Sequence, residues 1–589
     1  MANASDVIVE GLQAWGVDVV FGLPGDGVNG LVEAFRQRAG RIRFVLVRHE
    51  EAAAFAASAY AKFTGRLGVC VATSGPGAIH LLNGLYDAKL DGAPVLALTG
   101  QTYSDLIGSR YQQEVDLLRL FDDVSAYNVQ VNSAEHATTV VDLACRHALA
   151  RRGVAHLNVP VDVQEAPLKG DYSRQNVGRH TAPADVDLRP RAPREAVERA
   201  ARILRDARRP ALVVGSGARG AREEVVRLSR VLQAPIVKPL LGKDVVPDDD
   251  PHCLGGIGML GTAPGVKALE TCDCLVMLGT SFPDLAYLPK PGSVPAVQLD
   301  VDPARIGLRY PVDVGLVGDA GATLRDLLPL LQSRGQSDWL AGLQGEMREW
   351  RALLEDRATR GEDAPIRPQL VLRELNARLR DDAIVACDTG TVTAWAARHL
   401  EMRAGQRFTA SGTLASMACG LPYAIAAQVA FPERQVVAVV GDGGLLMLAG
   451  ELSVAAHHSL PVKVVVLNNG SLGMIRWEQM VFLGNPSYAV DLPPVDIAGL
   501  ATAMGVKGYH VERARDVGAI LDEALRHDGP ALVDCAVDPH EPPMPPKAKL
   551  ADGVRLAEAL ARGEPEGGRV ALTLFRDKLD DLAWRARRP

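Results

Sequence analysis

Several features that mark whole classes of protein are scarce or missing in this chain. Its 589 residues contain no uninterrupted apolar stretch of the length that spans a bilayer, so we expect no membrane-spanning helix. The first residues, MANASDVIVEGL, have neither a basic segment nor a long apolar core, so we expect no signal peptide. Aromatic residues make up only 5% of the chain, but hydrophobic residues make up 47% and charged residues 23%, which is typical of a globular protein.

The charge balance and the cysteines argue against two further classes. Lysine and arginine number 64 against 71 acidic residues, for a net charge of −7, and no long basic run is present. Nucleic-acid binding therefore has no electrostatic support. The eight cysteines are scattered, and none forms a CxxC pair or a metal-type spacing. We expect reduced, structural thiols in a cytoplasmic protein.

The organisation of the chain predicts several α/β domains. Short β-branched runs alternate with amphipathic stretches, which is typical of parallel sheets covered by helices. The length exceeds that of one hydrophobic core. We predict an α/β protein with three doubly wound parallel-sheet domains and a C-terminal helical tail. The expected ranges are 1–165, 194–335 and 367–540 for the domains, 166–193 and 336–366 for the linkers, and 541–589 for the tail.

The strongest motif lies in VVAVVGDGGLLMLAGELSVAAHHSLPVKVVVLNNGSLG. One apolar run is followed by Asp442, and the next apolar run ends, 27 positions later, in Asn469. If the two strands are parallel neighbours, both side chains emerge at the carboxyl edge of the sheet and offer two hard oxygens to one cation. Gly443 and Gly444 let the backbone approach an anion at a helix N-terminus, so Mg²⁺ with phosphate oxygens is the predicted ligand. An ordinary buried βαβ unit with a glycine-rich turn is the alternative.

A GDG motif followed at this distance by NN resembles the thiamine diphosphate enzymes. In that family the aspartate, the second asparagine and a backbone carbonyl two residues later hold Mg²⁺ on the diphosphate, which implies Asp442, Asn469 and Ser471 here. The similarity covers the whole chain and is greatest to the pyruvate oxidase and acetolactate synthase branch. It implies that the first domain binds the aminopyrimidine, the central domain is of the FAD-binding type, and the third domain binds the diphosphate.

The first domain supplies the expected catalytic acid. In VRHEEAAAFAASAYAK, Glu50 opens an alanine-rich helix, where the helix dipole favours a carboxylate. Most such acids only cap their helix. The resemblance, however, implies that Glu50 hydrogen-bonds the aminopyrimidine and promotes loss of the thiazolium C2 proton, while Glu51 is solvated or structural. Because Glu50 and Asp442 lie in different domains, the site must form between domains. The resemblance implies that it forms between the subunits of a homodimer or homotetramer.

Further cofactor contacts follow from the same resemblance. Met417 matches the apolar residue that supports the bent cofactor, although a methionine is more often core filler. Gly390 and Thr391, in CDTGTVTAW, match the loop over the diphosphate. Met474 matches a position between thiamine and flavin.

The middle domain raises the question of a dinucleotide. In ALVVGSGARGA, three glycines fit the G-x-G-x-x-G pattern of an NAD site. The confirming acid at the next strand end is absent, and Lys238 and Lys243 follow instead, which disfavours NAD. The domain instead resembles that of quinone-dependent pyruvate oxidases, with a middle domain that has lost its flavin as the alternative. This resemblance implies FAD contacts from Gly217, Gly258, Leu260, Gly261, Gly279, Thr280, Asp300 and Asp319.

The resemblance implies a reaction on a small 2-keto acid. We expect oxidative decarboxylation of pyruvate or a more polar relative to the carboxylate and CO₂, with electrons passing through FAD to a quinone. His80, Gln113 and Glu478 match polar pocket positions of this branch. Gln112 replaces the usual phenylalanine and Thr389 the usual valine, and both changes favour a more polar acyl group. The alternatives are an acetolactate synthase-like carboligase with structural or absent FAD, and a non-catalytic binding relative.

The tail carries an apolar stripe at helical spacing, formed by Leu572, Phe575, Leu579 and Leu582, with Trp584 nearby. Quinone-dependent pyruvate oxidases end in a similar helix, which engages the membrane surface. An amphipathic terminal helix is more often packed on its own protein, and acidic residues in this stretch argue against a lipid surface. We therefore expect a cytoplasmic protein, with peripheral association to the inner face of the cell membrane as the alternative.

Overall fold

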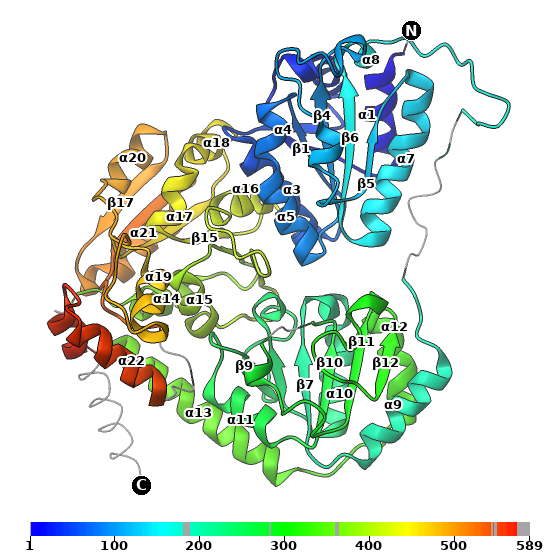
Figure 1. Ribbon diagram of the computed structural model, residues 1–589. Helices are drawn as coiled ribbons and strands as arrows, with labels where there is room; N and C mark the ends of the chain where they lie inside the picture. The colour runs from blue at the N-terminus through cyan, green and yellow to red at the C-terminus, as the bar shows by residue number, and fades with distance from the viewer. Residues whose placement is uncertain are drawn as a thin grey trace.

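Three α/β domains make up the computed structural model, which describes residues 2–178, 180, 189–281, 284–359, 365–543, 546 and 550–573 (Figure 1). Each domain is built on a six-stranded sheet in which every described strand pair is parallel. The predicted fold class is thereby confirmed. In Figure 1 the first domain lies at the top, the middle domain at the bottom and the third domain at the left.

The first and third sheets follow the same path. The first has the order β2-β1-β3-β4-β6-β5, and the third has the order β14-β13-β15-β16-β18-β17. The strands of the first sheet are β1 (Val19–Gly22), β2 (Arg43–Leu46), β3 (Gly68–Ala72), β4 (Val95–Gln101), β5 (Ser125–Gln130) and β6 (Val154–Pro160). Those of the third are β13 (Ile384–Cys387), β14 (Arg407–Ala410), β15 (Val436–Gly441), β16 (Lys463–Asn468), β17 (Lys507–Val511) and β18 (Ala531–Ala536). The strand order of the third sheet reverses between β13 and β15, where open sheets bind ligands.

The strand order of the middle sheet, β12-β11-β10-β7-β8-β9, reverses between β7 and β10. Its central strands are fully buried apolar runs, as expected for a parallel sheet covered on both faces. The strands are β7 (Pro210–Val214), β8 (Ile236–Lys238), β9 (Cys253–Gly256), β10 (Cys274–Leu278), β11 (Ala296–Asp300) and β12 (Val314–Val317).

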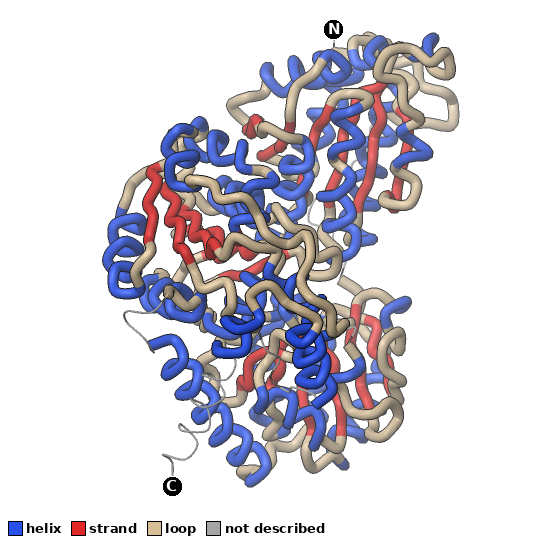
Figure 2. Tube along the Cα trace, turned by 60° about the vertical axis from the view of Figure 1, so that its left-hand side comes forward, coloured by secondary structure: helices blue, strands red, loops and turns tan. Residues whose placement is uncertain are grey.

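Helices cover both faces of the sheets, as the tube view also shows (Figure 2). Those of the first domain are α1 (Ala4–Ala14), α2 (Asn29–Gln37), α3 (Glu50–Thr64), α4 (Pro76–His80), α5 (Leu82–Asp91), α6 (Leu117–Leu120), α7 (Ala134–Arg151) and α8 (Val161–Gln164). The middle domain has α9 (Arg194–Asp206), α10 (Arg222–Leu232), α11 (Ala263–Thr271) and α12 (Ala320–Leu327). The third has α14 (Pro368–Arg378), α15 (Thr391–His399), α16 (Gly420–Ala430), α17 (Asp442–Met447), α18 (Leu452–His457), α19 (Gly473–Trp477), α20 (Ile497–Ala503) and α21 (Val517–Arg526).

The first and third domains share one hydrophobic core. Helices α3 and α16 pack against each other, and a single cluster of buried residues runs from the first sheet through both helices into the third sheet. Helix α3 is apolar nearly all round, as expected for a helix buried between two layers. Helix α3 also packs closely on α5, because Gly84 of α5 has no side chain and a Cβ there would lie only 2.5 Å from the Phe55 nitrogen. These two domains are therefore one packing unit.

The stretch predicted as the second linker, 336–366, contains a long helix, α13 (Asp338–Thr359), which packs on α11 and α14. In the tail, α22 (Leu550–Ala561) packs on the π-helical turn η9 (Glu478–Phe482), with Ala559 against Trp477 and Met480. Of the predicted stripe, Leu572 is 67% exposed, and Phe575, Leu579 and Leu582, together with the nearby Trp584, lie outside the described residues. Within the described part of the chain, no helix is both long and apolar enough to cross a membrane.

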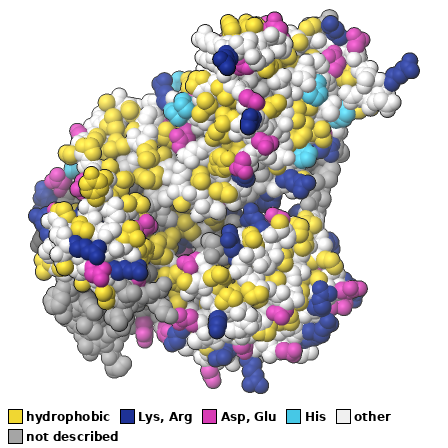
Figure 3. Space-filling model, viewed as in Figure 1, with side chains coloured by type: hydrophobic (Ala, Val, Ile, Leu, Met, Phe, Trp, Pro, Cys, Tyr) yellow, Lys and Arg dark blue, Asp and Glu magenta, His cyan; other side chains and the backbone are white. Residues whose placement is uncertain are grey.

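Charged side chains of both signs lie on the surface, and the thiols lie inside the protein. On the face shown in Figure 3, acidic and basic side chains are interspersed over the outer helices. All eight cysteines are buried and carry free thiols.

Candidate active site

A cavity of about 430 Å³ lies at the carboxyl ends of β13, β15 and β16. It brings together most of the residues predicted in the third domain, together with one predicted in the middle domain. These are Gly390, Thr391, Met417, Asp442, Gly443, Gly444, Asn469, Ser471, Met474 and Glu478, with Leu260 from the middle domain. Thr389, which departs from the family pattern, lines the same cavity.

Asp442 lies at the end of β15, and its carboxylate is near the residues that follow β16. Strand β15 ends at Gly441, α17 begins at Asp442, and only 4% of the Asp442 surface is exposed. The backbone N–H groups of Gly443, Asn469 and Gly470 lie near its carboxylate and favour the ionised form. Burial nevertheless raises the pKa of Asp442 to about 6, so the ionised form lacks full compensation. A cation at this carboxylate would supply that compensation.

Asn469 is held beside Asp442 by its own turn. The backbone N–H of Ser471 donates to Asn469 Oδ1 over 3.2 Å. A Cβ on Gly473 would lie 2.6 Å from Asn469 Nδ2, so only glycine leaves room for the amide there. A carboxylate, a side-chain amide and the Ser471 carbonyl are oxygen donors of the kind that Mg²⁺ takes together with phosphate oxygens. The residues present therefore fit the metal that the motif predicts.

The opposite wall of the cavity can receive an anion. Gly390 has a φ of +131°, and the space where its Cβ would stand is open. Thr391 begins α15, so the free backbone N–H groups of this helix face the cavity. Across from it, a Cβ on Gly444 would collide with Asp388 Oδ2. These glycines form the cradle that a diphosphate needs.

Asp388 is a site residue that our sequence reasoning missed. It follows β13 and is almost fully buried, and burial raises its pKa to about 7. Its Oδ1 accepts from the Thr389 N–H over 2.7 Å, while its Oδ2 has no hydrogen-bond partner among the described residues. The available signal was an acid directly after an apolar strand, the same signal that identified Asp442.

The middle domain reaches the cavity through a few apolar side chains. Leu240, Met259 and Leu260 line it opposite the third-domain residues. The loop that carries Met259 and Leu260 is anchored, since the Arg398 guanidinium donates to the Met259 carbonyl. Leu240 and Met259 were not predicted, because an apolar side chain in a loop gives no distinctive sequence signal.

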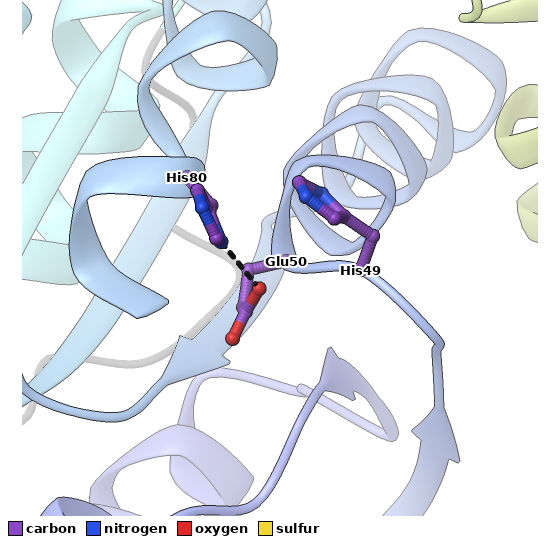
Figure 4. A group of neighbouring side chains, drawn as sticks. All are labelled: His49, Glu50 and His80. Carbon is purple, nitrogen blue, oxygen red and sulfur yellow. Dashed lines mark hydrogen bonds and ion pairs between the residues drawn. The ribbon is translucent and has the colours of Figure 1, made fainter. Parts of the chain in front are cut away.

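Glu50 and His80, predicted separately, contact each other in the first domain (Figure 4). Glu50 is the first residue of α3 and only 7% exposed, and His80 ends α4. Glu50 Oε2 lies 2.9 Å from His80 Nδ1, and the ring of His49 stacks on that of His80 with centroids 4.5 Å apart. Ligand atoms of these three residues all lie within 4.8 Å of one another.

The first-domain residues do not line the cavity of the same chain. Neither Glu50, His80 nor Gln113 is among its lining residues. Gln113 instead has a left-handed φ of +59° and accepts a hydrogen bond from the Ser74 hydroxyl over 3.0 Å. The cavity within one chain therefore holds the predicted metal and diphosphate residues without the predicted catalytic acid.

The predicted FAD residues lie at or after the carboxyl ends of strands of the middle sheet, and three of them, Gly217, Gly279 and Thr280, lie at its reversal point. The Gly217 N–H donates to the Gly279 carbonyl over 3.1 Å, and Gly279 has a φ of +58°. Asp300 ends β11 and is mostly buried, which raises its pKa. Asp319 accepts from the Ala322 N–H and so caps α12. Thr280 follows β10, and Gly258 and Gly261 follow β9.

Three parallel α/β domains, with a magnesium-type donor set and a glycine cradle on the third, define a cofactor-dependent enzyme of the thiamine diphosphate class. The comparisons agree. The chain matches the family models for the N-terminal TPP binding domain (residues 2–120), the central domain (197–327) and the C-terminal TPP binding domain (388–535) of thiamine pyrophosphate enzymes. The protein belongs to the thiamine pyrophosphate enzyme family.

Curated relatives match the chain over almost its whole length. It is 43% identical to YdaP of Bacillus subtilis, named as a candidate thiamine pyrophosphate-containing protein, over 92% of this chain and 93% of the relative. It is 33% identical to a pyruvate oxidase of Lactiplantibacillus plantarum, over 93% and 90% of the two chains. It is 36% identical to the large subunit of acetolactate synthase isozyme 2 of Escherichia coli, over 93% and 98%. The expected pyruvate oxidase and acetolactate synthase branch is confirmed.

Proposed function

We propose that this protein is a thiamine diphosphate- and FAD-dependent oxidase of a small 2-keto acid, which it converts to the carboxylate and CO₂. One observation carries the proposal: the cavity at the metal and diphosphate residues is also lined by Leu240, Met259 and Leu260 of the middle domain. An electron pair released in this cavity would lie beside the domain expected to hold FAD. A quinone is the proposed final acceptor.

The residues divide the work by position. Asp442, Asn469 and the Ser471 carbonyl would hold Mg²⁺, while Gly390, Thr391 and Gly444 would receive the diphosphate. Thiamine diphosphate supplies the electron sink for decarboxylation when it is bound. Met417 lines the cavity where it would support the cofactor, and Met474 and Glu478 line the space left for the substrate.

A shared site between subunits follows from the position of Glu50. This acid is buried, is held by His80 and lies outside the cavity of its own chain. We infer that it completes the cavity of a neighbouring subunit in a homodimer or homotetramer, where Glu50 would exchange a proton with the aminopyrimidine. Glu50, His80 and Gln113 would then belong to the neighbour's substrate pocket.

The substrate is proposed to be more polar than pyruvate. Thr389 lines the cavity and presents a hydroxyl where the family pattern has valine. A buried hydroxyl needs a hydrogen-bond partner, which a hydroxylated acyl group supplies and a methyl group does not.

An acetolactate synthase-like carboligase is the second candidate. It is supported by the 36% identity to the Escherichia coli acetolactate synthase subunit, which exceeds the 33% identity to the pyruvate oxidase. In that case FAD would be structural or absent, and a second carbonyl compound would take the place of the electron acceptor.

The visible spectrum of the purified protein tests the proposal directly. The protein is supplied with thiamine diphosphate and Mg²⁺, and spectra are taken before and after anaerobic addition of pyruvate or hydroxypyruvate. We expect a flavin band that bleaches, faster with hydroxypyruvate. A bound flavin that stays oxidised while the keto acid is consumed favours the carboligase. A preparation that binds no flavin contradicts the oxidase.

A further inference from the structure

A second buried acid lies between the metal turn and β16. Glu451 ends the short helix η8 (Ala449–Glu451), and only 1% of its surface is exposed. Its Oε1 accepts hydrogen bonds from the backbone N–H groups of Arg48, over 2.9 Å, and of His49, over 3.0 Å. A third-domain side chain therefore holds first-domain backbone some 400 positions away in the same chain.

These two N–H groups lie directly before the helix that begins with Glu50. His49 caps that helix, since its Nδ1 accepts from the Glu51 N–H over 3.2 Å, and its ring stacks on His80. Without Glu451, two part-buried backbone donors would lose their partner, which is unfavourable wherever water cannot replace it. The turn would then rotate to recover hydrogen bonds, and Glu50 and His49 would move with it.

We propose that Glu451 is a positioning residue that fixes the direction of Glu50 and its contact with His80. The inference rests on the proposed function, in which Glu50 is the acid that meets the aminopyrimidine. Glu451 itself touches neither the cavity nor its predicted ligands among the described contacts.

The two hydrogen bonds that Glu451 accepts from the Arg48 and His49 N–H groups form a clamp, and the position of Glu451 in the chain connects this clamp to both active sites. The segment that begins with Asp442, at one active site, reaches Glu451 nine residues later and there holds Glu50. In the proposed dimer, this Glu50 serves the neighbour's site. One short segment thus connects the metal ligand of one site to the catalytic acid of the other.

The chemistry of the clamp predicts which substitution it tolerates. Only Oε1 is used, and Oε2 has no hydrogen-bond partner among the described residues. Burial raises the pKa of Glu451 to about 7, so a neutral group is acceptable at this position. Glutamine keeps the accepting oxygen, whereas alanine removes it. Glu451→Gln should therefore retain the clamp that Glu451→Ala loses.

The first test compares these two variants with Ser453→Ala as a matched control. Ser453 accepts from the Arg48 side chain over 3.1 Å and so contacts the same segment without holding its backbone. We expect Glu451→Ala to raise amide hydrogen exchange at residues 47–52 and to lower kcat about 10- to 100-fold, as expected for a small misplacement of a catalytic group. Glu451→Gln and Ser453→Ala should stay within a few-fold of wild type in both measurements. Unchanged exchange in Glu451→Ala overturns the inference whatever the activity.

The second test distinguishes an action of Glu451 on Glu50 from an action on the metal turn of its own chain. Glu451→Ala and Asp442→Ala chains are unfolded together and refolded as mixed dimers. Random association makes half of the dimers mixed. If Glu451 acts through Glu50, each mixed dimer has one intact site of two, and the mixture recovers about a quarter of wild-type activity. If Glu451 instead supports its own metal turn, no mixed site is intact and activity stays low, which overturns the inference.

A parallel mixture separates this inference from the proposed function. Glu50→Ala and Asp442→Ala chains should also complement each other if the site is shared between subunits. Failure of this control pair contradicts the shared site itself, and the exchange measurement at residues 47–52 then decides the role of Glu451 alone. Success of the control with failure of the Glu451→Ala pair overturns only the positioning role.

Discussion

Three acids of the third domain, Asp388, Asp442 and Glu451, are almost fully buried along the path from β13 to β16. Burial raises the pKa of each well above that of an exposed carboxyl, to between about 6 and about 7. Such groups are costly to stability and concentrate where a protein binds ions or moves protons. In this chain, Asp442 lines the predicted metal and diphosphate site, Asp388 lies against Gly444 of that site, and Glu451 holds the turn before Glu50.

Removal of the Asp442 carboxylate should abolish metal-dependent cofactor binding. We expect Asp442→Ala to weaken the affinity for thiamine diphosphate with Mg²⁺ by about 100-fold or more. Loss of a residue that only supports a metal ligand typically weakens binding by about 10- to 100-fold, and loss of the ligand itself should weaken it more. Isothermal titration calorimetry measures this affinity. Asp381→Ala removes an exposed carboxylate of the same domain and should leave it unchanged. Equal affinities in the two variants would contradict the metal site.

Substitution of Glu50 should separate chemistry from binding. Glu50→Gln keeps the size of the side chain but cannot transfer a proton, so kcat should fall about 10²- to 10⁴-fold. Cofactor affinity should change little, because the metal and diphosphate contacts lie on the third domain. Steady-state kinetics and calorimetry on the same preparation check this split. An unchanged kcat would remove Glu50 from the catalytic role.

The Glu451 carboxyl should make stability depend on pH in a defined direction. Its pKa is about 4.5 in the unfolded chain and about 7 in the folded protein, so the folded state binds more protons in this window. The free energy of unfolding contributed by this group therefore falls as pH rises from about 5 to about 7 and levels off above that. Relative to Glu451→Gln, the wild type should lose at most about 3 kcal/mol over this range.

Urea unfolding of the two proteins at matched pH values measures this difference, because Asp388 and Asp442 titrate in both and cancel. A difference that stays constant between pH 5 and pH 8 would show that Glu451 does not titrate in this window.

At the scale of elements, helix α3 connects the two ends of the site. Its first residue is Glu50, and in its last turn Lys62 Nζ contacts Asp87 Oδ2 over 2.8 Å, Asp91 Oδ2 over 2.7 Å and the Tyr423 hydroxyl over 2.7 Å. Asp91 also accepts from the N–H groups of residues 412 and 413, in the loop that leads to Met417. The first domain thus anchors a loop of the third-domain cavity through one buried cation.

Loss of the Lys62 ammonium group should lower the free energy of unfolding. Lys62→Met leaves two buried carboxylates without their partner, which typically costs about 3–5 kcal/mol. The matched control is Arg36→Met, whose partner Glu33 is on the surface, and it should cost less than about 1 kcal/mol. Urea unfolding compares the two variants, and limited proteolysis reports on residues 410–417. Equal stability of the two variants would show that the buried network is not needed.

At the scale of the whole molecule, the cores decide which parts can fold alone. The first and third domains each have one cluster of their own and share a further, larger cluster through α3 and α16, whereas the two clusters of the middle domain involve only residues 192–350. A domain that shares a core with its neighbour exposes apolar surface when it is separated.

Excision of domains should therefore give opposite results. A fragment of residues 189–359 should fold cooperatively and remain soluble, since it contains both middle-domain clusters and α13. A fragment of residues 1–165 should aggregate or bind a hydrophobic dye, because α3 loses its partner α16. Circular dichroism melts and dye binding distinguish the two. A cooperatively folded first-domain fragment would contradict the shared core.

The sequence by itself determined the features that depend on neighbouring positions. Apolar runs predicted parallel strands, and polar residues at the ends of β15 and β16 meet at one edge because parallel strands share their carboxyl ends. Asp442, Asn469 and the opening of α3 at Glu50 could be assigned in this way. The middle-domain glycines could be assigned only by resemblance.

Only the tertiary structure decided the contacts between segments far apart in the chain. Nothing periodic links Glu451 to Arg48, Lys62 to Tyr423, or Met259 to the cavity of another domain. The first two pairs exist because α3 and α16 pack together between two sheets, which brings residues hundreds of positions apart to hydrogen-bond distance. Met259 reaches the cavity because its loop is held by Arg398 of the third domain. The sequence alone thus predicted which groups carry the chemistry, and the packing of domains determined what holds them in place.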